Sequence, residues 1–451
     1  CLCQTRHRWR CPALRKFVLV YGLATTRVLQ PLNDSTSAGD KPPRRSGSLE
    51  LMRNREFVSL WFVGGALNTV RWLETLAVGV VVFEITASPF AVALMVILRF
   101  LPLALLGALT GALAERINRR VLLLVSMLVM GVASLWFGVM ALNGHVTLWL
   151  LSASALLNGL LWAFDNPVRR TLFADVVTPA QLGSAMTLDS VTSNSTRFVG
   201  PVLGGLFLEY AGIHGVFFLG SLLYAVATLI MLFGTRVAGS QKLGGGSSVF
   251  SSLLNGFRLL RRERTLQGVL AVTLVFNVWG FPFVSMIPVI GKEVLGLTPL
   301  PLGVLMGAEG VGALSGALLI LAFAELRHYR YLYTYGTFLC LVMAFAFSQV
   351  ESFLPAAGFL FLVGIGAGCF SAMQGVLVML CTPVEARGRM MGVLSVCIGL
   401  CTVGFLHIGL LGNWLGAELA IVICTVEGFL VLLLVCRLWP EVLASQTLPD
   451  R

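Results

Sequence analysis

Residues 107–120 read Gly-Ala-Leu-Thr-Gly-Ala-Leu-Ala-Glu-Arg-Ile-Asn-Arg-Arg. This stretch closes one long apolar run, 90–113, and leads into another, 121–142. Each run is long enough to cross a bilayer at about 20 residues per crossing. Because a backbone in hydrocarbon must satisfy its hydrogen bonds internally, such runs indicate helices. The stretch therefore predicts two membrane helices joined by a short basic turn.

The whole chain has the composition of a polytopic membrane protein. Of its 451 residues, 57% are hydrophobic and 12% are charged, and the mean hydropathy is +0.88. Soluble domains carry roughly twice that share of charge. The composition excludes a soluble enzyme, a disordered protein and a disulfide-stapled secreted domain. The apolar residues suffice for about twelve crossings.

The hydropathy predicts twelve membrane helices and an all-α fold. The expected spans are 57–83, 90–113, 121–142, 146–165, 187–209, 213–233, 266–290, 302–323, 331–350, 354–378, 391–411 and 417–437. With both termini in the cytoplasm, the outer loops hold one basic residue, Lys292. The basic residues of the inner loops are Arg116, Arg119, Arg120, Arg169, Arg170, Arg236, Lys242, Arg258, Arg261, Arg262, Arg264, Arg327, Arg330, Arg387 and Arg389. This bias follows the positive-inside rule and predicts the N-in, C-in orientation.

The spans divide into two six-helix halves, 52–233 and 266–437. The segment between them, 234–265, contains Gly-Gly-Gly-Ser-Ser, which is typical of a flexible linker. It ends in a short expected helix with a basic face. Residues 438–451 form a C-terminal tail. Residues 1–51 carry a net charge of +6 out of the total +11. They are either a basic arm on anionic lipid or, as we favour, a disordered extension upstream of a start at Met52.

A weak internal repeat supports the two halves. Thr178-Pro179 precedes Met186 as Thr382-Pro383 precedes Met390, at an offset of 204 residues. Gly107 and Gly111 recur as Gly312 and Gly316 at an offset of 205. Two parallel six-helix repeats are typical of secondary transporters.

The turn after the second predicted helix resembles the signature of the major facilitator superfamily. The matching residues are Gly111, Leu113, Ala114, Arg116, Arg119 and Arg120, with Glu115 in place of an aspartate and Asn118 in place of a glycine. We expect a positive φ at Asn118, since asparagine tolerates it better than most residues. The resemblance implies a conformational latch made of Gly107, Gly111, Glu115, Arg116, Asn118, Arg119 and Arg120. In this latch Glu115 would meet the N-terminus of helix 11, and Arg119 would join it there. The alternative is a solvated basic turn that serves topology alone.

Other motifs narrow the resemblance to the branch of macrolide-efflux and enterobactin-export proteins. They are Arg99-Phe-Leu-Pro102, Asp165-Asn-Pro-Val-Arg169, Leu182 with Ala185, and Gly200-Pro201-Val-Leu-Gly204-Gly205. The resemblance covers Met52 to about Arg437. The last run also belongs to an antiporter motif, whose upstream glycines are replaced here by Thr187 and Thr196. Gly200, Gly204 and Gly205 permit close helix approach and Pro201 a bend, with simple packing as the alternative role.

Charges at membrane depth mark a second group of candidate residues. These are Arg71, Glu74, Arg99, Arg197, Glu309 and Glu427. Such charges are costly in lipid and should face a cavity or a partner. The arginine surplus in the first half favours a cationic cavity for amphipathic or anionic solutes. Glu309, without a basic neighbour in its own helix, or Glu74, expected in a permanent ion pair, would carry a coupling proton. Asp165 beside Arg169 and Arg170 is either a gate or a cap, and Glu427 has a structural role.

Asn68, Asn158, Asn277 and Gln374 lie in helices 1, 4, 7 and 10, which the family resemblance places around the central cavity. They are the substrate-contact candidates, with interhelical hydrogen bonding as the alternative. His407 and the seven cysteines from Cys340 to Cys436 are expected to pack. No metal-ligand spacing and no phosphate-binding loop is present in the sequence. We therefore expect no metal, no cofactor and no ATP-driven step.

Together these features predict a proton-coupled exporter of small amphipathic compounds such as a drug, macrolide, siderophore or metabolite. The expected location is the bacterial cytoplasmic membrane, and the expected state is a monomer that binds no nucleic acid. A second transport hypothesis is uptake of lysophospholipid or another solute. A membrane-embedded enzyme and a non-transporting sensor are hypotheses of another class. The enzyme lacks an acid or histidine cluster at a membrane surface, and the sensor lacks a soluble domain.

Overall fold

The computed structural model describes residues 51–114, 118–235, 258–260, 263–383 and 386–444. These residues form helices and the turns between them, and they contain no strand. Residues 1–50 of the predicted arm, residues 236–257 and 261–262 of the linker with most of its short basic helix, and residues 445–451 of the tail lie outside the described residues. The fold class predicted from hydropathy is therefore all-α in the part that is described.

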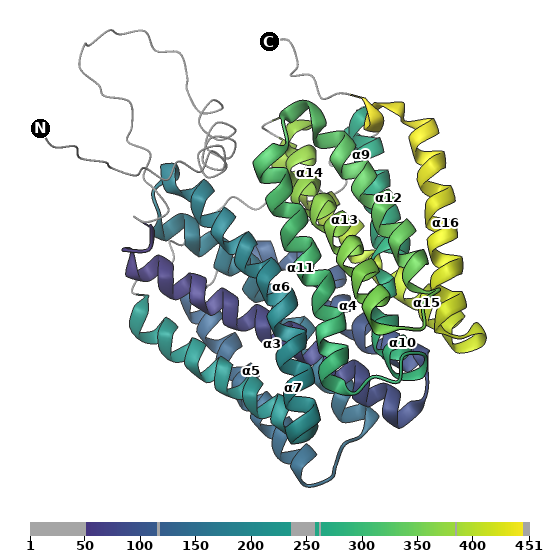
Figure 1. Ribbon diagram of the computed structural model, residues 1–451. Coiled ribbons are helices and arrows are strands. Elements are labelled where there is room, and N and C mark those ends of the chain that lie inside the picture. The colour runs from purple at the N-terminus through teal and green to yellow at the C-terminus, as the bar shows by residue number, and fades with distance from the viewer. Residues whose placement is uncertain (1–50, 115–117, 236–257, 261–262, 384–385, 445–451) are drawn as a thin grey trace, which may run out of the picture.

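The first half of the chain forms one group of helices (Figure 1). They are α3 (Arg55–Thr86), α4 (Pro89–Ala114), α5 (Arg119–Leu142), α6 (Leu148–Val176) and α7 (Pro179–Gly234). The elements of the second half are α9 (Arg264–Val275), η1 (Phe276–Gly280), η2 (Pro282–Met286), α10 (Ile287–Glu293), α11 (Pro299–Phe323), η3 (Leu326–His328), α12 (Tyr329–Phe347), α13 (Phe353–Leu380), α14 (Arg387–Gly399), α15 (Cys401–Leu415), α16 (Ala417–Leu438) and η5 (Pro440–Leu443).

Ten helical segments of the described chain are long and apolar enough to cross a membrane, and Pro89–Leu105 is a shorter apolar helix. Element α7 consists of two helices that meet at a kink, which lies at the expected junction between 187–209 and 213–233. At that junction Gly212 has φ +69° and ψ −176°, a backbone conformation that glycine adopts without strain. The crossing Arg264–Glu293 combines α9, a π-helical turn, a 3-10 turn and α10. Pro282 starts the 3-10 turn, where its missing N–H interrupts the α-helical ladder.

Two helix ends differ from the sequence-based expectation. Asn118 has φ −60° and ψ 111°, and its side chain accepts hydrogen bonds from the backbone N–H groups of Arg120 and Val121. The expected positive φ is therefore wrong, and asparagine stands here because it caps the N-terminus of α5. Helix α6 does not end at Asp165 but continues to Val176, so Asp165 lies inside a helix.

The two halves meet along two pairs of helices. Helix α7 packs along α11, and α4 packs against α15 and α14. Figure 1 shows α3, α5, α6 and α7 on one side, α12, α13 and α16 on the other, and α4 and α11 between them. Glycines bring the backbones together at both contacts. A Cβ atom at Gly303 of α11 would meet the Pro201 carbonyl of α7. One at Gly399 of α14 would lie 2.9 Å from the Ala104 Cβ atom of α4.

The close approach of α7 and α11 predicts that an added methyl group destabilises the protein at Gly303 but not at an open position such as Gly358. We expect Gly303→Ala to lower the free energy of unfolding by about 1–3 kcal/mol, because the new Cβ has no room against the Pro201 carbonyl. The matched control is Gly358→Ala in α13, where nothing lies within 4 Å of the added atom. Thermal unfolding of the purified protein in detergent measures both variants. Equal unfolding temperatures for the two would contradict close packing at Gly303.

Candidate functional site

A buried polar network joins α3, α4 and α6 at the middle of the first half. The Glu74 carboxylate accepts a hydrogen bond from Asn158 Nδ2 at 2.9 Å and lies 3.5 Å from an Arg99 guanidinium nitrogen. Each of these three residues is at most 4% exposed. Arg99 also donates to the Arg71 carbonyl oxygen at 2.7 Å and to the Thr75 hydroxyl. The expected ion pair of Glu74 is therefore present, and its partner is Arg99 rather than the helical neighbour Arg71.

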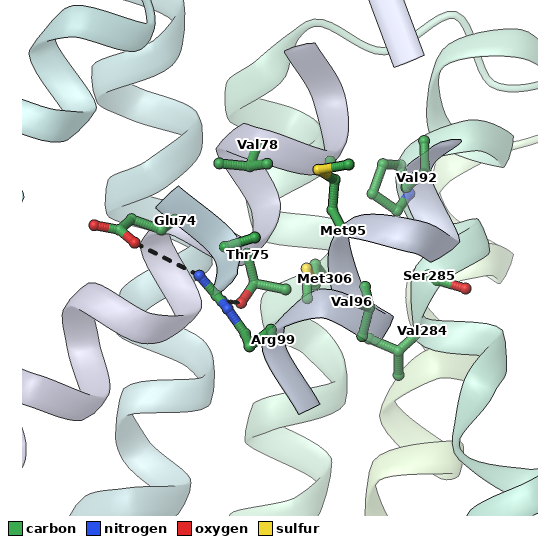
Figure 2. A pocket seen from close by; sticks show the side chains of 13 residues that line it. Glu74, Thr75, Val78, Val92, Met95, Val96, Arg99, Val284, Ser285 and Met306 are labelled. Atoms are coloured by element: carbon green, nitrogen blue, oxygen red, sulfur yellow. Dashed lines mark hydrogen bonds and ion pairs between the residues drawn. The ribbon is translucent and has the colours of Figure 1, made fainter. Parts of the chain in front are cut away.

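The network forms the polar end of a cavity of about 390 Å³ (Figure 2). Glu74, Thr75 and Arg99 lie at this end. The rest of the lining is mostly apolar and comes from both halves of the chain. It consists of Val78, Gly79, Val92, Met95, Val96, Ala155, Val284, Ser285, Pro288 and Met306.

Arg71 lies in a second, smaller cavity of about 190 Å³. One of its terminal nitrogens donates to Asn68 Oδ1 at 2.7 Å, and its guanidinium lies 4.3 Å from the centre of the Trp162 ring. Its Nε atom is buried without a hydrogen-bond partner. Asp165 and Arg169 also line this cavity.

Asp189 is a buried acid that the sequence analysis missed. It lies in α7, is 3% exposed and forms an ion pair with Arg169. Arg170 lies 3.8 Å from its second oxygen. Arg169 has room because Gly64 faces it: a Cβ atom there would lie 2.5 Å from the guanidinium carbon. The basic residues expected beside Asp165 therefore bind an acid of another helix, while Asp165 faces Arg71 across the small cavity.

In the part of the chain that the structure describes, two ion pairs join the two halves, an exposed one between Glu84 of α3 and Lys292 of α10 and a buried one between α7 and α11. Arg197 of α7 binds the Glu309 carboxylate of α11, and its guanidinium lies 5.1 Å from the centre of the Trp72 ring of α3. Glu309 is 5% exposed. The helix backbones are close here, since a Cβ atom at Gly310 would lie 2.5 Å from the Arg197 carbonyl carbon. Glu309 thus lacks a basic neighbour in its own helix, as the sequence indicates, but has one on the facing helix.

The four amides differ in their surroundings. Asn68 and Asn158 bind Arg71 and Glu74, whereas Asn277 donates to the Thr273 carbonyl of its own helix at 2.9 Å. The Nε2 atom of Gln374 is buried without a hydrogen-bond partner. Neither Asn277 nor Gln374 is among the lining residues of the two cavities. The contact of these two amides with a substrate stays a prediction.

The residues of the expected latch are only partly described. Gly107 and Gly111 lie in α4, and Glu115 and Arg116 lie outside the described residues. Arg119 forms an ion pair with Asp175 at the end of α6, at 2.9 Å, and Arg120 donates to the Leu232 carbonyl at 2.9 Å. Both contacts fasten the turn to the first half. The contact of Glu115 with helix 11 stays a prediction.

The glycine run in α7 faces two different helices. A Cβ atom at Gly200 would lie 2.5 Å from the Trp72 Cβ atom, and one at Gly204 would lie 2.7 Å from the Leu73 carbonyl oxygen. Gly205 instead faces the Pro299 carbonyl at the start of α11. The run therefore serves packing both within the first half, on α3, and between the halves, on α11.

Two further charged side chains form a cluster away from the cavities. Glu427 of α16 accepts a hydrogen bond from the Trp279 indole N–H at 3.0 Å, and its carboxylate lies 3.3 Å from His407 Nε2. Both titratable side chains are more than a third exposed, at 36% for His407 and 41% for Glu427. Within the described residues no three His, Cys, Asp or Glu side chains are grouped as metal ligands would be.

Comparison with known proteins places this geometry in a family. The profile of the family described as "Transmembrane secretion effector" matches residues 46–448. The chain is 25% identical to an uncharacterised MFS-type transporter, YfiS, of Bacillus subtilis, over 83% of this chain and 91% of the relative. It is 21% identical to macrolide efflux protein A of Streptococcus pyogenes, over 71% and 80% respectively. A solved bacterial homologue of the human lysosomal transporter Spinster, in an inward-facing and unoccupied conformation, superposes with a TM-score of 0.69. The identity is 14%, over 90% of this chain and all of that one.

The buried network predicts that replacing Arg99 destabilises the protein far more than replacing the exposed Arg327. We expect Arg99→Met to lower the free energy of unfolding by about 3–5 kcal/mol, because it leaves the Glu74 carboxylate as a buried charge without its cation. The double variant Arg99→Met with Glu74→Met should recover most of that loss. Arg327→Met is the matched control, since its ion pair with Glu325 is about two-thirds exposed and contributes little. Chemical unfolding in detergent measures all of them. A loss in the double variant as large as in the single one would contradict the pairing.

Proposed function

The chain belongs to the transmembrane secretion effector family of major facilitator transporters, and from this membership and the charge geometry we propose that it exports small amphipathic compounds in exchange for protons. The relatives and structural neighbours are transporters, so the chain is a multi-pass membrane transporter and not an enzyme. The proposal is carried by one observation above the rest. The Arg197–Glu309 ion pair joins the two halves, at a point where a change of charge can separate them.

We infer a twelve-helix, N-in and C-in arrangement from two supporting facts. If α7 is divided at Gly212 and the shorter α4 is counted as a crossing, the ten apolar segments become twelve. The basic residues then gather in loops on one side of the membrane, as the positive-inside rule requires of the cytoplasmic side. The helices before and after the linker then form two halves of six crossings each.

This topology predicts which loop positions reagents reach. In a variant whose native cysteines are replaced by serine, His145→Cys should react with a membrane-impermeant maleimide added to intact cells. His145 lies in the exposed turn between α5 and α6, on the expected outer side. Arg327→Cys, in the exposed turn between α11 and α12, should react only after the cells are permeabilised. The reverse pattern would contradict the N-in orientation.

Alternating access requires two halves that are rigid and an interface that can open. The pairs Glu74–Arg99 and Asp189–Arg169 lie within the first half and hold its helices together. The interface between the halves combines the Arg197–Glu309 pair with glycine contacts, which bring the backbones of α7 and α11 close together. The apolar cavity is lined from both halves, so a relative rotation of the halves would change its exposure.

Coupling to protons follows from the charge of Glu309. When Glu309 is ionised, its attraction to Arg197 holds α7 against α11, and in a low-dielectric surrounding this attraction is strong. A proton on Glu309 removes the charge and therefore the attraction. Arg197 is then still supported by the Trp72 ring of its own half through a cation–π contact. Protonation thus favours separation of the halves without leaving Arg197 unsupported.

The direction and the compartment rest on the relatives. The family is described by secretion, and one relative is named for macrolide efflux. We therefore propose export, from the cytoplasm of a bacterium across its inner membrane, of compounds that fit an apolar cavity with a polar end. Within this cycle, the turn after α4 would act as the latch, with Glu115 meeting helix 11 in one state and Arg119 staying on Asp175.

The proposed coupling predicts a specific loss in Glu309→Gln. In proteoliposomes with a fluorescently labelled macrolide as the probe, we expect an imposed pH gradient to accelerate movement by the unchanged protein. In Glu309→Gln we expect movement down the probe gradient to persist but the acceleration to vanish, because glutamine cannot bind and release the proton. Glu325→Gln, an exposed carboxylate in a loop, is the matched control and should keep the acceleration. An unchanged response in Glu309→Gln would reject this residue as the coupling site.

A further inference from the structure

We propose that Arg71 binds the anionic head of an amphipathic substrate whose apolar part occupies the larger cavity. This assignment rests on the proposed export function and names its substrate class: single-headed amphiphiles with a carboxylate or similar monoanionic group. Three features support this assignment. Two cavities lie on one helix, the charges around Arg71 sum to a positive value, and the hydrogen bonding of Arg71 is incomplete.

The two cavities lie along one face of α3. Asn68 and Arg71 line the smaller cavity, while Thr75 and Val78 line the larger one. These positions are separated by three or four residues, so their side chains share a helical stripe. From Arg71 to Gly79, at the far lining of the larger cavity, the helix rises about 12 Å. The stripe changes from polar to apolar along this length, as an amphipathic ligand requires.

The charges around the smaller cavity favour an anion. Two arginines, Arg71 and Arg169, line this cavity against one acid, Asp165, which leaves a net charge of +1. Asp189 is engaged by Arg169 and Arg170. The larger cavity adds no net charge, because its Glu74 and Arg99 neutralise each other. A monoanionic group in the smaller cavity therefore brings the local sum to zero.

Arg71 is the arginine of this region whose guanidinium is held in place but not saturated. Asn68 fixes one terminal nitrogen, and the Trp162 ring lies against the guanidinium plane. The buried Nε atom has no partner, although an unmade hydrogen bond of a buried charged group is costly. A guanidinium presents its donors as a planar fork that matches a carboxylate with two parallel hydrogen bonds. Arg99, by contrast, already binds Glu74, Thr75 and the Arg71 carbonyl.

The larger cavity suits the apolar part of such a molecule. Its lining away from Glu74 and Arg99 is aliphatic, with two methionines, Met95 and Met306, that face it from different halves of the chain (Figure 2). Methionine side chains are flexible and polarizable, so they adapt to apolar groups of different shape. The head is thus selected by charge, and the body by contact with an apolar lining that adapts to its shape.

The test uses three naphthalene compounds that differ only in the head: naphthylbutyrate, naphthylbutyramide and naphthylbutylamine. Binding to the full chain in lipid nanodiscs is measured by calorimetry. We expect the acid to bind more tightly than the amide, and the amine to bind most weakly. Arg71→Gln should weaken the acid about tenfold, as expected for a hydrogen-bonded charge, and leave the amide unchanged. Arg170→Gln, an arginine with a side chain 55% exposed, is the matched control and should alter the acid less than Arg71→Gln does.

A second variant keeps the proposal testable if Arg71→Gln fails to fold. Asp165→Asn removes the acid that faces the same cavity, so it should tighten binding of the acid and not of the amide. Binding of the amine in preference to the acid would overturn the proposal, and so would equal losses of acid and amide in Arg71→Gln. Macrolide export by a protein without acid selectivity would contradict this site alone. Acid selectivity in a protein that exports nothing would support the site and contradict the proposed function.

Discussion

A charge in the hydrocarbon core of a bilayer costs about 2.5–3.5 kcal/mol on insertion scales unless it finds a partner, and this cost organises the interior of the protein. Glu74 lies against Arg99, Asp189 against Arg169, and Glu309 against an arginine of the opposite half. The first two pairs connect helices within one half, so they make that half behave as one body. The third connects the halves, so its strength bears on the equilibrium between their arrangements. The same physical rule therefore yields rigidity in two places and a breakable contact in a third.

The glycine contacts between α7 and α11 lie beside the Arg197–Glu309 pair, so a change in that pair can move the two helices apart. Along α7 and α11, backbone meets backbone at Gly205, Gly303 and Gly310. A contact of this kind has little steric resistance to sliding, and its strength depends on how closely the helices approach. The cross-half ion pair sits beside the Gly310 contact. A change in the charge of Glu309 thus acts where a small displacement costs least.

The sequence predicted the helices well because hydropathy is a local property, and it located the deep charges because they interrupt apolar runs. It did not identify their partners, because ion pairs such as Glu309 with Arg197 are separated by more than a hundred residues and depend on helix packing. Asp189 was missed since it lies at the edge of its predicted span, where a charge needs no explanation. The turn chemistry of Asn118 was misjudged because asparagine serves both left-handed turns and helix N-termini, and only the backbone angles distinguish them. The break at Gly212 lies at the predicted junction, but hydropathy does not encode that the helices on its two sides follow each other without a loop.

The distribution of charge between the halves links the binding of an anionic substrate to the binding of a proton. At depth, the first half carries three arginines, Arg71, Arg99 and Arg197, against one acid, Glu74. Glu309 is an acid of the second half without a cation of its own helix. The first half therefore attracts Glu309 with a net positive charge that its own acids do not cancel. If an anionic substrate binds Arg71, it lowers that net charge and weakens the attraction for Glu309, as a proton on Glu309 does from the opposite side. Both ligands then favour separation of the halves, and each acts by differential affinity for the two arrangements, as any ligand that shifts a conformational equilibrium must. An anion at Arg71 and a proton at Glu309 are in this sense equivalent electrostatic signals, and a cycle that exchanges them across the membrane needs no direct contact between the two sites.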